Sequence, residues 1–209
     1  MQVHRAASSL RGHPGRVVAP ISHAPRGRIV LLRVLFVCAG NICRSPLAEA
    51  LFRHRVQEEG LQDVVSCDSA GTGAWHVGEP PCPGTLRTLK RLGISSEGLV
   101  ARQVRPEDLT AFDYILAMDR ENLEDLHRLA ARAGKTIGRA DIAEPDGGED
   151  ARIELLLSYA PEIGTLDVND PYYNGRHDET YRQVAAGVEG FWRHLKSRLM
   201  QDGSLKNAK

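Results

Sequence analysis

The sequence predicts an α/β fold of three layers, in which a four-stranded parallel sheet carries helices on both faces. Three observations predict it. Short, continuous apolar runs alternate along the chain with segments of helical periodicity, which is the pattern of a wrapped parallel sheet. A loop of small residues joins the first apolar run to the helix after it. The length of 209 residues, with 42% hydrophobic and 26% charged residues, suits one well-formed core.

The predicted strands are the apolar runs at residues 34–37, 64–68, 114–118 and 153–157. The first reads as a central strand, because strands buried on both faces are continuously apolar. Residues 29–37 could also pass for the apolar part of a secretory signal, but Arg33 interrupts the run. No stretch approaches the roughly 18 apolar residues of a membrane span, so no membrane partner is expected.

The helices are predicted from their apolar spacing and their end signals. The first opens at Ser45-Pro46, with Ser45 as its cap, and stops at Gly60. The second stops at Gly93, and a third covers residues 122–129. The closing helix spans residues 178–200, with an inward face that consists of Tyr181, Val184, Val188, Phe191, Trp192 and Leu195.

Charge is unevenly distributed along the chain. The 27 basic and 27 acidic residues cancel, which argues against a nucleic-acid partner. Residues 1–33, however, contain six arginines and no acid. We therefore expect residues 1–32 to be a basic extension, whose composition fits a transit peptide, a flexible tail or an over-long start. A catalytic domain is expected over 33–200, followed by a tail over 201–209. The Gly-rich acidic stretch at 134–152 is expected to be a surface insertion of that single domain.

Cysteine and histidine usage points to a reducing, cytoplasmic setting without metal. The four cysteines are too few and too irregular for a secreted disulfide framework. The eight histidines form no cluster with ligand-like spacing, so neither a metal nor another cofactor is expected.

The loop after the first strand, Cys38-Ala-Gly-Asn-Ile-Cys-Arg44, carries the chemistry. Gly40 and Asn41 tolerate the left-handed backbone of a tight loop, which can aim successive N–H groups at one anion. The following helix adds its own N–H groups and dipole, and Arg44 can grip a phosphate with two parallel bonds. Cys38 lies in this positive field and is expected to be a thiolate, which can accept a phosphoryl group. The predicted phosphate-binding residues are Ala39, Gly40, Asn41, Ile42, Cys43, Arg44 and Ser45.

The segment Val37-Cys-Ala-Gly-Asn-Ile-Cys-Arg-Ser-Pro46 resembles the phosphate loop of the low-molecular-weight protein tyrosine phosphatases, and Asp170-Pro-Tyr-Tyr173 resembles their general-acid loop. The similarity runs from about residue 34 to about residue 200. It implies a protein tyrosine phosphatase, a phosphoric monoester hydrolase that works through a phosphorylated Cys38. Phosphotyrosine-containing proteins would be its substrates, and a monomer is expected.

Each remaining site residue has a role that the resemblance implies. Asp170, in a dipeptide that elsewhere marks a turn, would protonate the leaving oxygen and then assist hydrolysis of the intermediate. The aromatic rings of Trp75, Tyr172 and Tyr173 would wall the site, although core packing is the alternative for either tyrosine. The hydrogen-bond network that supports the loop would include Asn41, Ser45 and Ser69. One departure is Leu99, where the family commonly has His, so the network is expected to be shorter.

Cys43 is a candidate redox residue because it lies in the same loop as Cys38. A neighbouring thiol can trap an oxidised Cys38 as a disulfide and so prevent over-oxidation. The alternative is a small residue packed under the loop. Cys67 and Cys82 are interpreted as structural or incidental.

Two other functions are compatible with this scaffold. An arsenate reductase would need further cysteines after the third strand, and residues 114–126 contain none. A catalytically silent phosphotyrosine-binding module would be expected to lack Cys38 or Asp170, and both are present.

Overall fold

The computed structural model describes residues 31–135 and 151–201. Most of the expected extension (1–32), insertion (134–152) and tail (201–209) lies outside the described residues. The described ends of these segments belong to the fold instead, since Leu32 begins a strand, Arg152 begins another and Gln201 ends the last helix.

Four parallel strands form the sheet, in the order β2-β1-β3-β4. They are β1 (Leu32–Cys38), β2 (Val65–Gly71), β3 (Tyr114–Ala117) and β4 (Arg152–Leu155). As predicted, β1 is central, and its four apolar residues at 34–37 are completely buried. The predicted four-stranded parallel sheet is confirmed.

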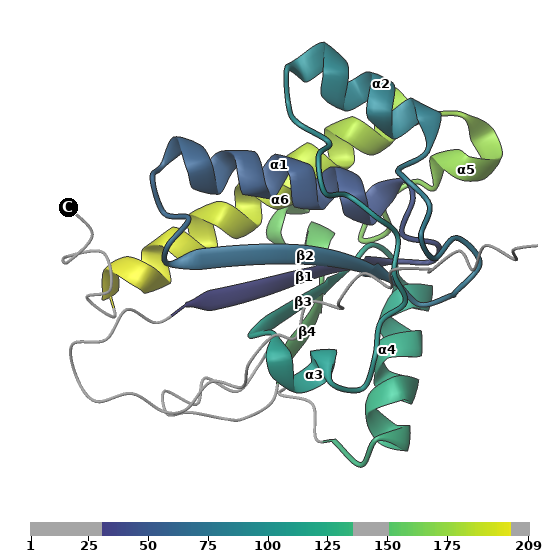
Figure 1. The fold of residues 1–209 in the computed structure, drawn as a ribbon. Helices are drawn as coiled ribbons and strands as arrows, with labels where there is room; N and C mark the ends of the chain where they lie inside the picture. The colour runs from purple at the N-terminus through teal and green to yellow at the C-terminus, as the bar shows by residue number, and fades with distance from the viewer. Residues whose placement is uncertain (1–30, 136–150, 202–209) are drawn as a thin grey trace, which may run out of the picture.

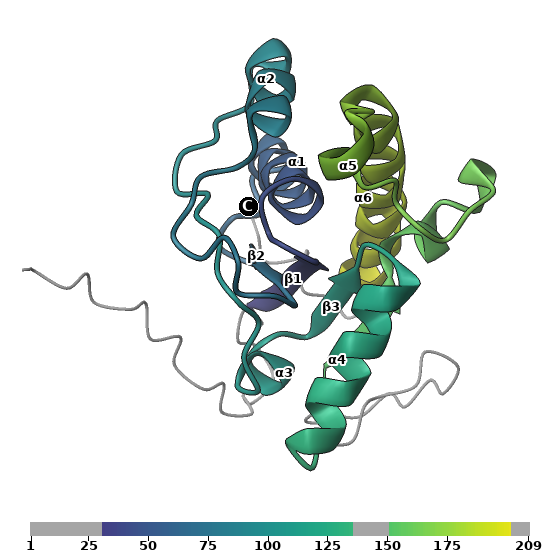
Figure 2. The same cartoon turned by 90° about the vertical axis from the view of Figure 1, so that its right-hand side faces the viewer.

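Helices cover both faces of this sheet (Figure 1). On one face lie α1 (Arg44–Glu58), α2 (Pro83–Leu92) and α6 (His177–Gln201), and on the other lie α3 (Asp108–Ala111) and α4 (Arg120–Arg132), an arrangement that Figure 2 shows from the side. The short α5 (Pro171–Asn174) precedes α6.

Alternation along β1 divides the core into two halves. Val34 and Phe36 belong to the cluster under α1 and α6, whereas Leu35 and Val37 belong to the cluster under α3 and α4. Successive side chains of a strand point to opposite faces, so a continuous apolar run feeds both clusters. The predicted three-layer architecture follows from this one strand.

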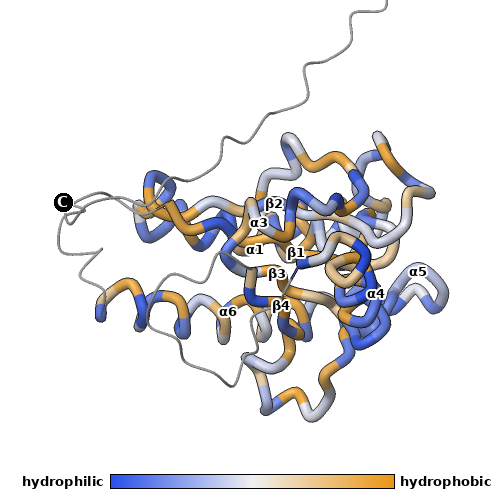
Figure 3. Tube along the Cα trace, turned by 90° about the horizontal axis from the view of Figure 1, so that it is seen from below, coloured by the Kyte–Doolittle hydropathy of each residue, from blue (hydrophilic) through white to orange (hydrophobic). Residues whose placement is uncertain are grey.

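Helix α6 closes the first cluster. Hydrophobic and hydrophilic residues alternate along it (Figure 3), which is the pattern of a helix with one buried face. Of the six residues predicted to face inward, all but Tyr181 are fully buried, and Tyr181 is partly exposed. The ring of Phe52 from α1 contacts those of Phe36, Phe191 and Trp192, with centroids 5.5 to 5.7 Å apart.

Several predicted boundaries are wrong. The second strand, predicted at 64–68, continues to Gly71, because it pairs with β1 as far as Cys38. The strand at 153–157 stops at Leu155, because β3 offers no partner beyond Ala117, and Leu156–Tyr159 instead form a 3₁₀ turn. Ser45 is not a cap: α1 begins at Arg44 after Cys43, which makes no side-chain cap bond. The Ser45 hydroxyl is directed into the site described below.

The 3₁₀ turn packs directly on α6 at Gly190. A Cβ atom on Gly190 would lie 1.9 Å from the carbonyl oxygen of Tyr159, which is backbone and cannot move aside cheaply. We therefore expect Gly190→Ala to destabilise the fold by about 2 kcal/mol or more, through overpacking. Urea unfolding monitored by circular dichroism measures this loss. Ser197→Ala, on the exposed face of the same helix, should stay within about 0.5 kcal/mol of wild type; equal stability of both variants would contradict the close contact.

Candidate active site

The candidate active site lies where β1 ends and α1 begins. Parallel strands place their carboxyl ends at one edge of the sheet, so the loops that follow β1, β2 and β3 meet there. Asn41, in the middle of the first loop, has a φ of 56° and is the one described residue other than glycine in the left-handed region. This backbone turn curls the loop between Cys38 and Arg44.

The Cys38 sulfur is buried and held by polar groups. It lies 3.0 Å from the Ser45 hydroxyl oxygen and accepts a hydrogen bond from the Asn41 backbone N–H at 3.3 Å. Both groups can donate to a thiolate, and hydrogen bonds to a charged form stabilise it. The structure thus brings Ser45 and Cys38 together, as the sequence resemblance implied.

A chain of hydrogen bonds supports this loop from behind. The Asn41 side-chain amide donates to the hydroxyls of Ser45 and Ser69, both at 2.9 Å, and its oxygen accepts from the Arg102 backbone N–H at 2.9 Å. Ser69 in turn donates to the carboxylate of Glu49 at 2.7 Å. Hydrogen bonds therefore connect the expected supporting residues, and the same series of bonds continues to Glu49, which was not expected. Leu99 is a buried apolar residue and adds no polar member.

Sequence reasoning missed Glu49, although a signal was present. Ser45, Glu49, Phe52 and Val56 follow the i, i+4, i+7, i+11 spacing of one helical face, and all are buried. A glutamate on such a stripe indicates a buried carboxyl with a partner. Burial raises its pKa to about 7, although the Ser69 hydrogen bond and the charge of Arg53, 3.6 Å away, act in the opposite direction.

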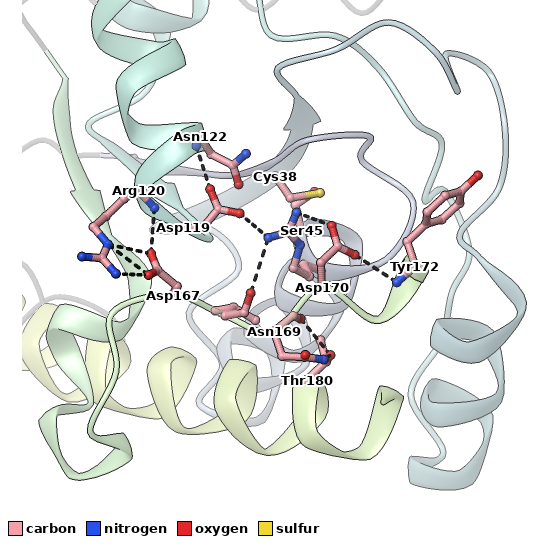
Figure 4. A network of polar contacts seen from close by, with 12 residues as sticks. Cys38, Ser45, Asp119, Arg120, Asn122, Asp167, Asn169, Asp170, Tyr172 and Thr180 are labelled. Carbon is pink, nitrogen blue, oxygen red and sulfur yellow. Dashed lines mark hydrogen bonds and ion pairs between the residues drawn. The ribbon is translucent and has the colours of Figure 1, made fainter. Parts of the chain in front are cut away.

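Arg44 is the cation of the site, and its guanidinium is 3% exposed. One terminal nitrogen pairs with Asp119 and lies 3.4 Å from the Val168 carbonyl oxygen, and the other pairs with Asp170 at 2.6 Å (Figure 4). Burial by itself lowers the pKa of Arg44, but the charges of Cys38, Asp170 and Asp119 outweigh it, so the pKa is raised. The side chain therefore stays fully charged.

Asp119 is a second residue that sequence reasoning left without a role. Its carboxylate caps α4 by accepting the Asn122 backbone N–H at 2.7 Å, and it also pairs with Arg44. An aspartate that precedes a helix is expected to cap it. Nothing local in the sequence indicates that Asp119 also contacts Arg44, 75 positions away. Asp170 likewise caps α5 through the Tyr172 N–H at 3.0 Å, so the general-acid candidate is both fixed and in contact with Arg44.

Aromatic side chains stand at the mouth of the site. Tyr172 and Tyr173 are 57% and 87% exposed, which excludes core packing for both, and Trp75 is 73% exposed. The Tyr172 ring lies 5.1 Å from that of Tyr173 and 5.9 Å from the ring of His76. His76, which the sequence did not single out, lies directly on the loop: its ring carbon Cδ2 is 3.0 Å from where a Cβ on Gly40 would be.

The structure pairs Cys43 differently from the expectation. Its sulfur is joined to that of Cys82 in a disulfide, with the two Cα atoms 5.5 Å apart, and Cys38 remains free. Cys82 is therefore not incidental. The reason is tertiary: the segment after β2 returns across the loop, and the Cys82 backbone N–H donates to the Ile42 carbonyl oxygen at 2.6 Å.

Two general properties complete the description. Within residues 31–135 and 151–201, no three His, Cys, Asp or Glu side chains gather as a metal site would require. Among the helices of the same residues, none is both long and apolar enough to cross a membrane.

Comparison with known proteins identifies a family and several relatives to which this chain is closely similar. The family model for low molecular weight phosphotyrosine protein phosphatases matches residues 33–205. The low molecular weight protein-tyrosine-phosphatase YfkJ of Bacillus subtilis is 43% identical over 159 residues, which are 76% of this chain and 92% of YfkJ. The human low molecular weight phosphotyrosine protein phosphatase is 43% identical over 160 residues, which are 76% of this chain and 92% of the human protein.

Solved structures agree with these relatives. The crystal structure of YfkJ from Bacillus subtilis superposes with a TM-score of 0.70 at 40% identity, covering 83% of this chain and 99% of YfkJ. A Drosophila protein described as an arginine phosphatase superposes with a TM-score of 0.65 at 35% identity, covering 79% of this chain and 98% of that protein.

The fold and the site thus define an enzyme of the protein tyrosine phosphatase class. Within that class, the chain belongs to the low molecular weight phosphotyrosine protein phosphatase family.

The buried carboxyl of Glu49 predicts a pH-dependent stability. Because its pKa is raised from 4.5 to about 7 in the folded protein, the stability that the protonated group contributes is complete below pH 4.5 and is lost as the pH rises through 7. We expect wild type to lose about 3 kcal/mol more between pH 4.5 and pH 8 than Glu49→Gln, which cannot ionise. Urea unfolding at the two pH values measures the difference, and parallel pH profiles of the two proteins would contradict it.

Proposed function

We propose that the protein hydrolyses phosphotyrosine, and small aryl phosphates, through a phosphocysteine intermediate on Cys38. The observation that carries the proposal is the convergence of three groups. The Cys38 sulfur faces a curled loop, the Arg44 guanidinium lies beside it, and the Asp170 carboxylate touches Arg44 at 2.6 Å. A candidate nucleophile, a cation that can bind an anion and a candidate acid thus interact through Arg44, which supports phosphoryl transfer.

In the first step, the Cys38 thiolate attacks phosphorus, and the sulfur–phosphorus bond forms as the bond to the phenolic oxygen breaks. Asp170 gives its proton to the departing oxygen. The loop N–H groups from Ala39 to Ser45 and the α1 N-terminus stabilise the equatorial oxygens. In the second step, Asp170 takes a proton from water, water attacks phosphorus, and the thiolate is restored as inorganic phosphate leaves.

Substrate binding requires an exchange of partners at Arg44. A phosphate dianion would take the place of the Asp170 carboxylate on the guanidinium, and its negative charge would favour the protonated form of Asp170. Asp119 remains paired with Arg44 through this exchange and keeps it in place. The Arg44 Nε–H is buried and has no partner within the described part of the chain, so it can donate to a phosphate oxygen.

The walls of the site favour an aromatic ester. The rings of Trp75, Tyr172 and Tyr173 are exposed, and their flat apolar faces suit an aromatic phosphate ester. Proteins that contain phosphotyrosine are therefore the proposed substrates, with the enzyme acting as a monomer in the cytoplasm without metal or cofactor. The relatives reported above are named as phosphatases, which favours hydrolysis over arsenate reduction.

The mechanism predicts distinct losses in two variants. Cys38→Ser should lose about 10³-fold or more of kcat, because no phosphocysteine can form. Asp170→Ala should lose about 10² to 10³-fold with phosphotyrosine and much less with an ester whose phenolate leaves without a proton. Steady-state hydrolysis of two aryl phosphates of different leaving-group acidity measures both. Comparable turnover by Cys38→Ser, or faster hydrolysis of phosphoarginine than phosphotyrosine by wild type, would overturn the proposal.

A matched pair of variants tests the positioning role of Asp119. Asp119 pairs with the buried Arg44, whereas the neighbouring Asp167 pairs with Arg120 on the surface (Figure 4). Asp119→Asn is expected to lower kcat/KM about tenfold or more by freeing Arg44, while Asp167→Asn should change it less than about twofold. Inorganic phosphate inhibition provides the second readout: its Kd should rise only for Asp119→Asn. Equal effects of the two substitutions would exclude a specific role for Asp119.

A further inference from the structure

Cys82 and Cys43 are brought together by the fold. The Cys82 N–H donates to the Ile42 carbonyl oxygen at 2.6 Å, and the Thr85 hydroxyl donates to the Cys43 carbonyl oxygen at 3.0 Å. These bonds clamp the start of α2 onto the phosphate loop. The Cα separation of 5.5 Å lies within the range that a disulfide spans, so the bond forms without backbone movement.

The Cys43 side chain packs in a different cluster from the Cys38 side chain. It packs with Ile42 and Ala101 in a small cluster that Cys82 completes, whereas Cys38 belongs to the main core under α1. The Cys38 sulfur is held by Ser45 and Asn41 instead. To reach Cys38, the sulfur of Cys43 must leave this cluster, but it already touches Cys82.

Access favours Cys82 as the thiol that oxidants meet first. Cys82 is partly exposed, while Cys43 is 4% exposed beneath it. Cys67 is a poor competitor, because burial raises the pKa of its thiol and no other cysteine contacts it among the described residues. A thiol that stays protonated reacts slowly with peroxide.

We propose that Cys82 is the partner that Cys43 takes on oxidation, and that this disulfide leaves Cys38 active but removes the thiol that could rescue it. The redox state of Cys43 and Cys82, which an earlier oxidation sets, then determines whether a later oxidation of Cys38 is reversible. The statement about Cys38 rests on the proposed function, whereas the pairing itself rests on the geometry alone.

The chemistry balances with a hydroperoxide as the oxidant. The Cys82 thiol is oxidised to a sulfenic acid as hydrogen peroxide is reduced to water. The Cys43 thiol then attacks the Cys82 sulfur, the sulfur–sulfur bond forms, and the hydroxyl leaves as a second water. With Cys43 engaged, a sulfenic acid on Cys38 meets another peroxide and becomes sulfinic, which thiols do not reverse. With Cys43 free, the Cys43 thiol attacks Cys38–SOH, and water leaves as a reducible disulfide forms.

The full-length protein is first reduced with dithiothreitol, which opens the Cys43–Cys82 disulfide. The reductant is then removed, and the protein is oxidised in two stages. Stoichiometric hydrogen peroxide is first added in the presence of inorganic phosphate, which shields Cys38. Phosphate is then removed, and excess peroxide is added. A sample is withdrawn after each stage and its free thiols are alkylated, and its disulfides and sulfinic acid are mapped by non-reducing peptide mass spectrometry. Aryl phosphatase activity is measured on separate, unalkylated samples before and after dithiothreitol.

Wild type is expected to show a Cys43–Cys82 disulfide with retained activity after the first stage, and sulfinic Cys38 with lasting inactivation after the second. Cys82→Ser should start with normal activity, form a Cys38–Cys43 disulfide in the second stage, and recover at least about fivefold more activity in dithiothreitol than wild type. Cys67→Ser, the matched control, should behave as wild type.

A Cys38–Cys43 disulfide in wild type, or equal recovery of wild type and Cys82→Ser, would overturn the inference. These outcomes are separate from failure of the proposed function. If Cys38→Ser retained normal turnover, the mechanism would fall, whereas peptide mapping would still report the Cys43–Cys82 pairing.

Discussion

The buried guanidinium of Arg44 is the interaction on which the rest of the site depends. A charge that is 3% exposed is stable only when negative groups surround it. Asp119 and Asp170, from distant parts of the chain, pair with the guanidinium, and Cys38, at the start of the same loop, adds its charge. Each of these sits at the end of a strand or the start of a helix, so the register of the sheet determines whether they meet. The same arginine thus couples the integrity of the fold to the chemistry, since displacement of any partner leaves an uncompensated charge.

The sheet and the curled loop that contains Cys38 could be predicted because their signals are local. The apolar run at 34–37 identifies the central strand, and seven consecutive residues from Cys38 to Arg44 describe the anion loop. What could not be predicted depends on the path of the chain. Asp119 lies 75 positions from Arg44, and Cys82 lies 39 positions from Cys43, so neither contact has a signature in sequence. The burial of Glu49 could have been predicted from its position on the apolar face of a helix, but its partner Ser69 could not.

Polar support and aromatic walls serve different purposes at this site. The chain from Glu49 through Ser69 and Asn41 is buried and consists of short hydrogen bonds, which hold the loop in one shape. The rings of Trp75, Tyr172 and Tyr173 are exposed instead, and Tyr172 contacts only other surface rings, those of Tyr173 and His76, among the aromatic side chains that the structure describes. The site thus combines a buried, hydrogen-bonded loop with an exposed aromatic rim.

The topology also separates the variable parts of the chain from the chemistry. All catalytic candidates gather at the carboxyl ends of the strands. The two compositionally unusual segments, the arginine-rich leader and the acidic stretch, join the described chain next to Leu32 and Arg152, where β1 and β4 begin at the opposite edge. Fusion partners, affinity tags or fluorophores attached at those two junctions therefore enter the molecule on the far side from the substrate, which makes them the natural attachment points for labelling a working enzyme.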